Sequence, residues 1–111
     1  VQAEHIEAVE NIESIVRVEG IDGIMLGPYD LSASLGKMGQ LDDPTVVDAI
    51  ERIFQACQST GMPIGYFGVS ADAVRPYLQK GYNLILAGVD TLHLGNAAQD
   101  LMNELKPSPN D

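Results

Sequence analysis

Hydrophobic and polar positions follow two alternating periods along this chain. Short apolar runs of the kind that form buried strands lie at residues 1–4, 21–26, 63–68 and 82–89. After each run, apolar residues recur at helical spacing, over residues 7–18, 44–60, 70–80 and 91–105. A strand followed by a helix, repeated four times, predicts an α/β fold in which crossover helices join parallel strands.

Turn-forming residues mark the ends of several predicted elements. Asp43 and Pro44 suit the N-cap and the first position of a helix, and Gly61 and Gly81 suit helix C-termini. Pro76 falls inside the predicted helix 70–80, which it should kink or shorten because proline has no backbone N–H to donate. Residues 31–40 are rich in Ser and Gly, and this composition predicts a loop.

Two of the predicted helices carry apolar stripes that we expect to be buried. The stripe of helix 44–60 is Val46, Val47, Ile50, Ile53, Phe54 and Cys57, and that of the last helix is Leu94, Ala98, Leu101, Met102 and Leu105. Four strand–helix units in 111 residues have the density of half a (β/α)8 barrel. An open flavodoxin-like sheet fits the same pattern.

Charge and composition narrow the range of partners. Sixteen acidic residues against six basic ones give a net charge of -10. This balance argues against nucleic acid, which requires a basic footprint, and against an anionic membrane surface. No apolar run approaches the roughly 18 residues of a membrane span. The single Cys57 cannot form an internal disulfide, which favours a reducing, cytoplasmic setting.

Two carboxylates stand at the ends of consecutive predicted strands. Glu4 closes the first apolar run, and Asp30 follows Gly27 and Pro28 after the second. If the two strands are parallel neighbours, both carboxylates project from one edge, where they could hold a hard divalent cation. Such a cation could chelate a small 2-oxo acid and act as a Lewis acid. The alternatives are a solvated strand-end carboxylate for Glu4 and a helix or turn N-cap for Asp30.

The remaining polar candidates have structural interpretations as well. His93 lies one turn into the last helix, and we interpret it as a surface or interface histidine. Asp90 fits a helix cap, with a supporting role beside the site as the alternative. Ser32 and Ser34 either line a substrate mouth or satisfy the backbone of their loop. Cys57 has no recognisable paired base, so we interpret it as a buried helix residue.

Three segments are informative together: Val1-Gln2-Ala3-Glu4, Gly27-Pro28-Tyr29-Asp30-Leu31-Ser32-Ala33-Ser34-Leu35-Gly36 and Ala87-Gly88-Val89-Asp90-Thr91. They resemble the HpcH/HpaI family of metal-dependent class II pyruvate aldolases. The resemblance covers essentially the whole chain and matches the C-terminal half of the family. It implies strands five to eight of a (β/α)8 TIM barrel. Residues 1–106 would then form a half-barrel of four βα units whose N-terminal half is missing, and residues 107–111 a disordered tail.

The resemblance also implies a set of site residues. Glu4 and Asp30 would coordinate Mg²⁺, Mn²⁺ or Co²⁺. Gln2 matches a position that contacts substrate, and the backbone at Tyr29 and Asp30 would help to hold the pyruvate carboxylate. A smaller residue than Tyr29 is commoner at its position. The general-base His and the carbonyl-polarising Arg of the family belong to the missing half, so no catalytic residue is expected here.

The function implied by the resemblance is metal-dependent aldol cleavage or condensation of 2-oxo acids through a pyruvate enolate. Its partners would be pyruvate or a similar 2-oxo acid, an aldehyde, and further copies of the chain in a homo-oligomer. The fragment alone is expected to be inactive. Two alternatives remain: a non-catalytic half-barrel that associates with itself through exposed strand edges, and a citrate-lyase-like acyl-CoA lyase. The latter requires a CoA-binding surface, for which the sequence offers no basic cluster.

Overall fold

The strands form one parallel sheet. A computed structural model describes residues 1–106; the predicted disordered tail, residues 107–111, lies outside the described residues. The strands lie in the order β1-β2-β3-β4, and every neighbouring pair is parallel. This confirms the predicted α/β fold. It also excludes a flavodoxin-like order for these strands, in which the second strand along the chain would lie outside the first. Their bounds are β1 (Gln2–Ala3), β2 (Ile24–Leu26), β3 (Ile64–Gly68) and β4 (Leu84–Ala87).

The helices connect the strands as predicted, with well-defined ends. They are α1 (Ile6–Glu10), α2 (Ile12–Ile15), α3 (Pro28–Ser34), α4 (Pro44–Thr60), α5 (Ala71–Lys80) and α6 (Asp90–Leu105). The Asp43 side chain caps α4 by accepting a hydrogen bond from the Thr45 N–H at 2.9 Å. Gly61 and Gly81 end α4 and α5 in the left-handed conformation, with φ of 71° and 109°. Both glycines have the role that the sequence predicts.

Two local predictions were wrong in detail. The predicted helix 7–18 divides into α1 and α2 at Asn11, whose side-chain amide donates to the carbonyl of Glu7 at 2.8 Å. Residues 31–34, predicted to be loop, belong to α3, because Pro28 at its first turn favours helix entry and Leu31 is buried beneath it. Helix α5 has the predicted end at Lys80, and it is not shortened at Pro76.

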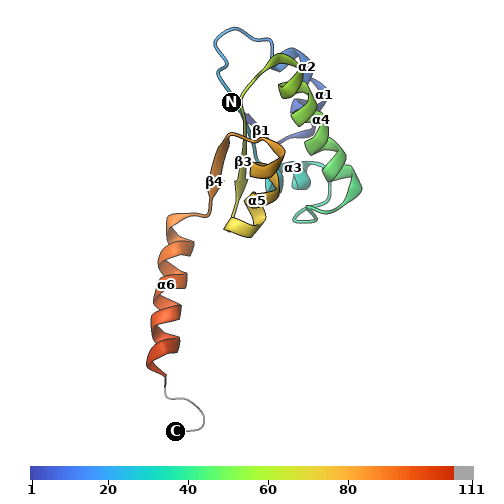
Figure 1. The fold of residues 1–111 in the computed structure, drawn as a ribbon. Helices are drawn as coiled ribbons and strands as arrows, with labels where there is room; N and C mark the ends of the chain where they lie inside the picture. Colours follow the sequence, from blue (N-terminus) through green and yellow to red (C-terminus); the bar gives the residue numbers. More distant parts are fainter. Residues whose placement is uncertain (107–111) are drawn as a thin grey trace.

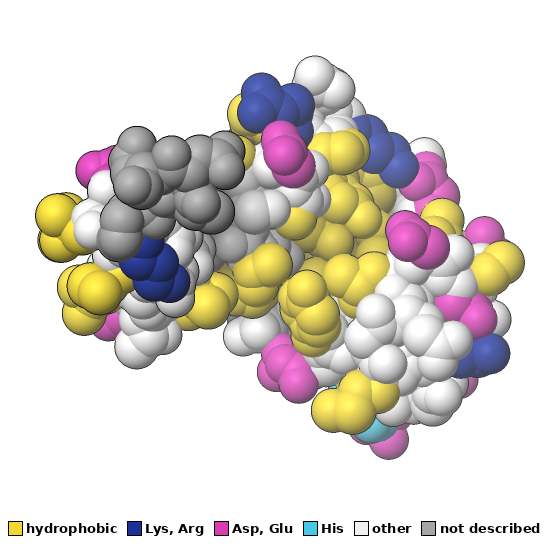
Figure 2. Space-filling model, turned by 90° about the horizontal axis from the view of Figure 1, so that it is seen from below, with side chains coloured by type: hydrophobic (Ala, Val, Ile, Leu, Met, Phe, Trp, Pro, Cys, Tyr) yellow, Lys and Arg dark blue, Asp and Glu magenta, His cyan; other side chains and the backbone are white. Residues whose placement is uncertain are grey.

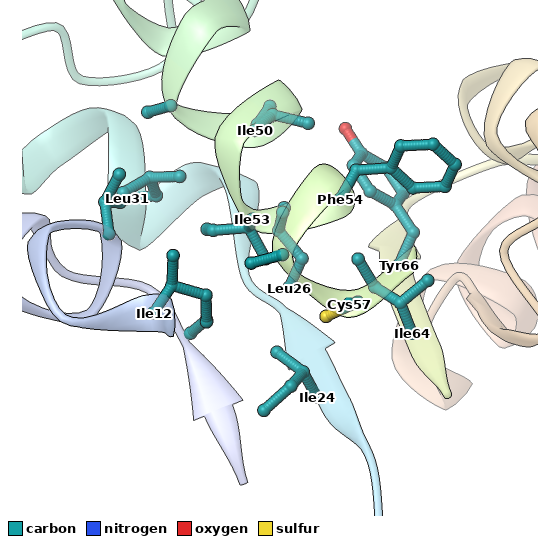
Figure 3. Packing of buried hydrophobic residues seen from close by; sticks show 14 of the residues in the cluster. Ile12, Ile24, Leu26, Leu31, Ile50, Ile53, Phe54, Cys57, Ile64 and Tyr66 are labelled. Carbon is teal, nitrogen blue, oxygen red and sulfur yellow. The ribbon is translucent and has the colours of Figure 1, made fainter. Parts of the chain in front are cut away.

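The hydrophobic core lies between one face of the sheet and α4. Ile24, Leu26 and Ile64 project from this face and are at most 1% exposed. Figure 3 shows them facing the side chains of α4, together with Ile12 from α2 and Leu31 from α3. The predicted stripe of α4 is buried with one exception: Val47 is 48% exposed. The core thus rests on the helix-covered face of the sheet.

The opposite face of the sheet is largely uncovered. Gln2, Met25, Gly65 and Leu84 are register partners across the four strands, so their side chains share this face. Met25 packs over Gly65, where an added Cβ would lie 2.6 Å from the Met25 Cε. Leu84 is 53% exposed. This face therefore carries apolar side chains that are open to solvent.

Helix α6 extends away from the rest of the molecule (Figure 1). With α6 included, the dimensions are 63 × 28 × 22 Å. None of the residues of α6 is buried, so the prediction of a buried stripe was wrong within this chain. Leu94 and Leu105 are 73% and 69% exposed. In the view from below, hydrophobic side chains gather in the centre of the surface with charged side chains at its borders (Figure 2). No helix within residues 1–106 combines the length and the apolar character needed to cross a bilayer.

Candidate metal and substrate site

The pairing of β1 with β2 brings Glu4 beside the end of β2. Gln2 is the register partner of Met25, and Ala3 is that of Leu26. The ladder continues one step further, because the Gly27 N–H donates to the carbonyl of Ala3 at 3.2 Å. Glu4 follows Ala3 directly, so it leaves β1 at the level of Gly27. This is the carboxyl edge of the sheet, where sites of α/β proteins lie.

Gln2 and Glu4 converge on Gly27. A Cβ added at Gly27 would lie 2.8 Å from the Glu4 Oε2 and 2.9 Å from the Gln2 Nε2. Gly27 has a φ of -103°, which any residue can adopt. A side chain at position 27 would therefore have to displace the Glu4 carboxylate or the Gln2 amide. No local pattern in the sequence predicts this contact.

Asp30 belongs to α3, which begins directly after Gly27. Gly27 is the N-cap of this helix, Pro28 is its first residue, and Asp30 lies in its first turn. The alternative interpretation of Asp30 as an N-cap is therefore wrong. A carboxylate in the first turn is favoured by the helix dipole. Asp30 and Tyr29 are both exposed, Tyr29 by 42%. Since Gly27 has no side chain, no side chain caps this turn.

Two serine hydroxyls fix the backbone around Asp30. Ser32, which is fully buried, donates to the carbonyl of Tyr29 at 2.6 Å and accepts from the Gly39 N–H at 3.0 Å. Ser34 donates to the carbonyl of Leu31 at 2.8 Å. Both hydroxyls satisfy backbone groups, which is the second of the two interpretations that the sequence allowed.

Both histidines engage backbone groups. The His5 side chain caps α1, with its Nδ1 accepting from the Glu7 N–H at 3.3 Å. His93 Nε2 lies 3.1 Å from the carbonyl of Ala87, at the turn from β4 into α6. Asp90 is the first residue of α6, not its N-cap, and accepts from the Thr91 N–H at 2.7 Å.

Most of the basic side chains are paired with carboxylates. Four of the six Lys and Arg side chains form ion pairs with carboxylates of the same chain: Lys37 with Asp43, Arg52 with Glu13, Arg75 with Asp72 and Lys80 with Glu51. Among residues 1–106, no cluster of three or more His, Cys, Asp or Glu side chains is arranged to hold a metal ion. Burial raises the pKa of Cys57 to about 11, which suits a buried thiol and not a nucleophile.

Comparisons with known proteins agree on one family. The sequence model of the HpcH/HpaI aldolase/citrate lyase family matches residues 1–97. A hydroxypyruvate/pyruvate aldolase of Cupriavidus necator is 37% identical over 111 residues, which are 100% of this chain and 41% of that protein. A 5-keto-4-deoxy-D-glucarate aldolase of Escherichia coli is 39% identical over 107 residues, 96% of this chain and 41% of that protein.

A solved structure extends the agreement to the fold. The crystal structure of an HpcH/HpaI aldolase/citrate lyase family protein from Burkholderia cenocepacia superposes with a TM-score of 0.92 at 34% identity, over 96% of this chain and 42% of that one. The chain thus spans about two fifths of the length of the relatives that it matches. By sequence and by fold, the chain belongs to the HpcH/HpaI aldolase/citrate lyase family.

Proposed function

We propose that residues 1–106 form strands five to eight of a (β/α)8 barrel, and that the complete protein catalyses metal-dependent aldol cleavage or condensation of 2-oxo acids. The chain covers about two fifths of its relatives, some of which are named as pyruvate or keto-sugar-acid aldolases. Its sheet has the sequential, parallel strand order of such a barrel. The exposed face with Met25 and Leu84 would then be the interior of the barrel.

The observation that carries this proposal is the convergence of Gln2 and Glu4 on Gly27, with Asp30 one turn further on. Carboxylate oxygens are the ligands that Mg²⁺, Mn²⁺ and Co²⁺ accept, and Glu4 and Asp30 supply them from adjacent elements. The close approach at Gly27 leaves no room for a side chain where the Glu4 carboxylate lies. The donor set therefore fits a hard divalent cation. Water, substrate and groups outside residues 1–106 would complete its coordination.

Each residue has a distinct task in this proposal. Glu4 and Asp30 hold the cation, which when bound supplies Lewis acidity toward the carbonyl of the 2-oxo acid. Gln2, beside Glu4, binds the substrate. The uncapped first turn of α3 presents the N–H groups of Tyr29 and Asp30 to the substrate carboxylate, an arrangement that favours an anion. The proton donor and acceptor come from the part of the barrel outside this chain, since His5 and His93 are bonded to the backbone elsewhere.

The experiment that tests this function is exchange of the pyruvate methyl protons into deuterated water, followed by NMR. The complete protein should catalyse exchange with Mn²⁺ or Mg²⁺, should lose it with EDTA and should regain it when the metal is restored. The 111-residue chain alone should be inactive, because it lacks the proton-transferring groups. Exchange that is insensitive to EDTA, or exchange by the 111-residue chain alone, would contradict the proposal.

A second candidate function, self-association, is favoured by the exposed apolar surfaces. Leu84 and Leu86 on the open sheet face are 53% and 48% exposed, and Leu101 and Leu105 on α6 are 57% and 69% exposed. Such surfaces mark interfaces in soluble proteins. The fragment would bury them by pairing with a second copy, and the complete protein would bury α6 in a homo-oligomer. Sedimentation of the fragment and of the complete protein distinguishes these two kinds of association. Leu84→Ser makes the open sheet face polar, so it should change the association of the fragment and not that of the complete protein.

The third possibility, an acyl-CoA lyase, finds less support. A CoA site requires basic side chains that are free to meet phosphates. Lys37, Arg52, Arg75 and Lys80 are instead paired with carboxylates of this chain. We therefore keep the pyruvate-type aldolase as the proposed function, with activity toward a 2-oxo acid and an aldehyde in the cytoplasm.

A further inference from the structure

We propose that Ser34 is a positioning residue that fixes the segment of Glu4 relative to the segment of Asp30. The inference rests on the proposed metal site and assigns a task to a side chain that does not itself bind the cation. Its hydroxyl accepts a hydrogen bond from the Ile6 N–H at 3.1 Å and donates one to the carbonyl of Leu31 at 2.8 Å.

The positioning role of Ser34 follows from where its two partners lie in the chain. Ile6 lies two residues after Glu4, and Leu31 lies one residue after Asp30. A single hydroxyl thus connects the backbone beyond one predicted ligand to the backbone beyond the other. The Ser34–Ile6 bond joins residues 28 positions apart in the chain, so it links two elements and not two turns of one helix.

A second bond connects the same two segments on the other side of Glu4. The Gly27 N–H donates to the carbonyl of Ala3 at 3.2 Å. Glu4 therefore lies between two hydrogen-bonded links to the segment that runs from β2 into α3. One link precedes Glu4 and belongs to the sheet, and the other follows it and depends on Ser34 alone. Loss of the Ser34 hydroxyl would therefore leave the chain after Glu4 tied to α3 by packing only.

Local backbone chemistry explains why this bond forms. The Ile6 N–H belongs to the first residue of α1 and has no partner within that helix. His5, the N-cap, uses its side chain on the N–H of Glu7. Ser34 supplies the missing acceptor from α3. Ile6 and Ser34 are both partly buried, which limits the water available to replace the bond.

The test compares Ser34→Ala with a matched control, Ser59→Ala, in the complete protein. Ser59 makes the same kind of helix bond, to the carbonyl of Ala56 at 2.8 Å, but lies at the end of α4. We expect Ser34→Ala to weaken Mn²⁺ binding by about 10-fold, as loss of a residue that orients a ligand does, and to speed hydrogen exchange at the Ile6 amide. Ser59→Ala should alter neither quantity. Ser34→Thr, which keeps the hydroxyl, should restore binding.

Three outcomes would overturn the inference, in distinguishable ways. Unchanged Mn²⁺ affinity in folded Ser34→Ala would remove the positioning role and leave the metal site intact. Equal losses in Ser34→Ala and Ser59→Ala would show a general effect on stability. Absence of Mn²⁺ binding by the unmodified protein would overturn the proposed metal site and the role of Ser34 with it. If Ser34→Ala does not fold, Ser34→Cys provides the same comparison, because a thiol is a weaker acceptor of similar shape.

Discussion

The carboxylate of Glu4 lies against the backbone of Gly27: its Oε2 is 2.8 Å from the position that a Cβ would occupy there. This contact joins the end of β1 to the start of α3. Gly27 has an ordinary φ of -103°, so a side chain there would act on the site through this contact and not through a left-handed backbone. The site proposed here depends on this close approach.

Replacement of Gly27 by alanine should disturb the site without disturbing the fold in general. The new methyl group must displace the Glu4 carboxylate or the Gln2 amide, so Gly27→Ala should weaken Mn²⁺ binding by about 10-fold or more. Gly95→Ala in α6 is the matched control, because no atom of residues 1–106 beyond its chain neighbours and its own helix backbone lies within 4 Å of its added methyl. Equal Mn²⁺ affinity in the two variants, measured by electron paramagnetic resonance of free Mn²⁺, would contradict the prediction.

The hydrophobic core should depend on Ile53 of α4, which is 0% exposed. Truncation by Ile53→Ala leaves a cavity and should lower the free energy of unfolding by about 2–5 kcal/mol. Val47→Ala on the same helix should lower it by no more than about 0.5 kcal/mol, because Val47 is 48% exposed. Urea unfolding of the complete protein measures both values. Similar losses for the two variants would mean that α4 packs through a different face.

The thiol of Cys57 should be unreactive in the native protein. It is 0% exposed, and burial raises its pKa to about 11, so thiolate is scarce at pH 8. Ellman's reagent should therefore react with this thiol only after unfolding. Because the native pKa lies above that of an unfolded thiol, folding should also lose stability as the pH rises from about 9 toward 11. Rapid reaction of Cys57 with the reagent under native conditions would show that it is accessible.

Low pH should weaken the N-terminal cap of α4, which is formed by Asp43. The Lys37 ammonium, 3.0 Å from Asp43, and the N–H of Thr45 hold the pKa of the Asp43 carboxyl below its usual range. A depressed pKa stabilises the fold above the pKa of the unfolded carboxyl, about 3.9, and this contribution is lost as the pH falls through the native value.

The variant Lys37→Met removes the larger cause of that depression. Its acid-unfolding midpoint, followed by circular dichroism, should therefore move to higher pH. The control Lys106→Met changes a lysine at the end of α6, far along the chain from α4, and should leave the midpoint unchanged. An unchanged midpoint in Lys37→Met would mean that the ion pair contributes nothing to folding.

The sequence predicted the elements well where local chemistry determines them. Asp43 and Gly61 bound α4 as expected, because capping depends on a few neighbouring residues. It failed at Asn11, which divides a predicted helix although its backbone N–H still donates to the carbonyl of Glu7 at 3.1 Å. It failed again at Leu94, since an apolar helical stripe indicates that a face is covered but not by which chain.

The candidate site was predictable only in part. Gln2 and Glu4 stand two positions apart, so the alternation of a strand is enough to put both on one face, and the pairing of β1 with β2 agrees with this. Two features depend on tertiary contacts and could not be predicted: the approach of Glu4 to Gly27 and the bond from Ile6 to Ser34. Both join residues more than 20 positions apart in the chain, beyond the reach of any local pattern.

A Mn²⁺ titration of the complete protein and its isosteric variants is the most direct test of shared coordination by Glu4 and Asp30. Glu4→Gln and Asp30→Asn each remove one charged ligand and keep its shape, so each should weaken binding by at least about 10- to 100-fold. Asp90→Asn, at the start of α6, should bind as the unmodified protein does. Undiminished Mn²⁺ affinity in either Glu4→Gln or Asp30→Asn would contradict the account.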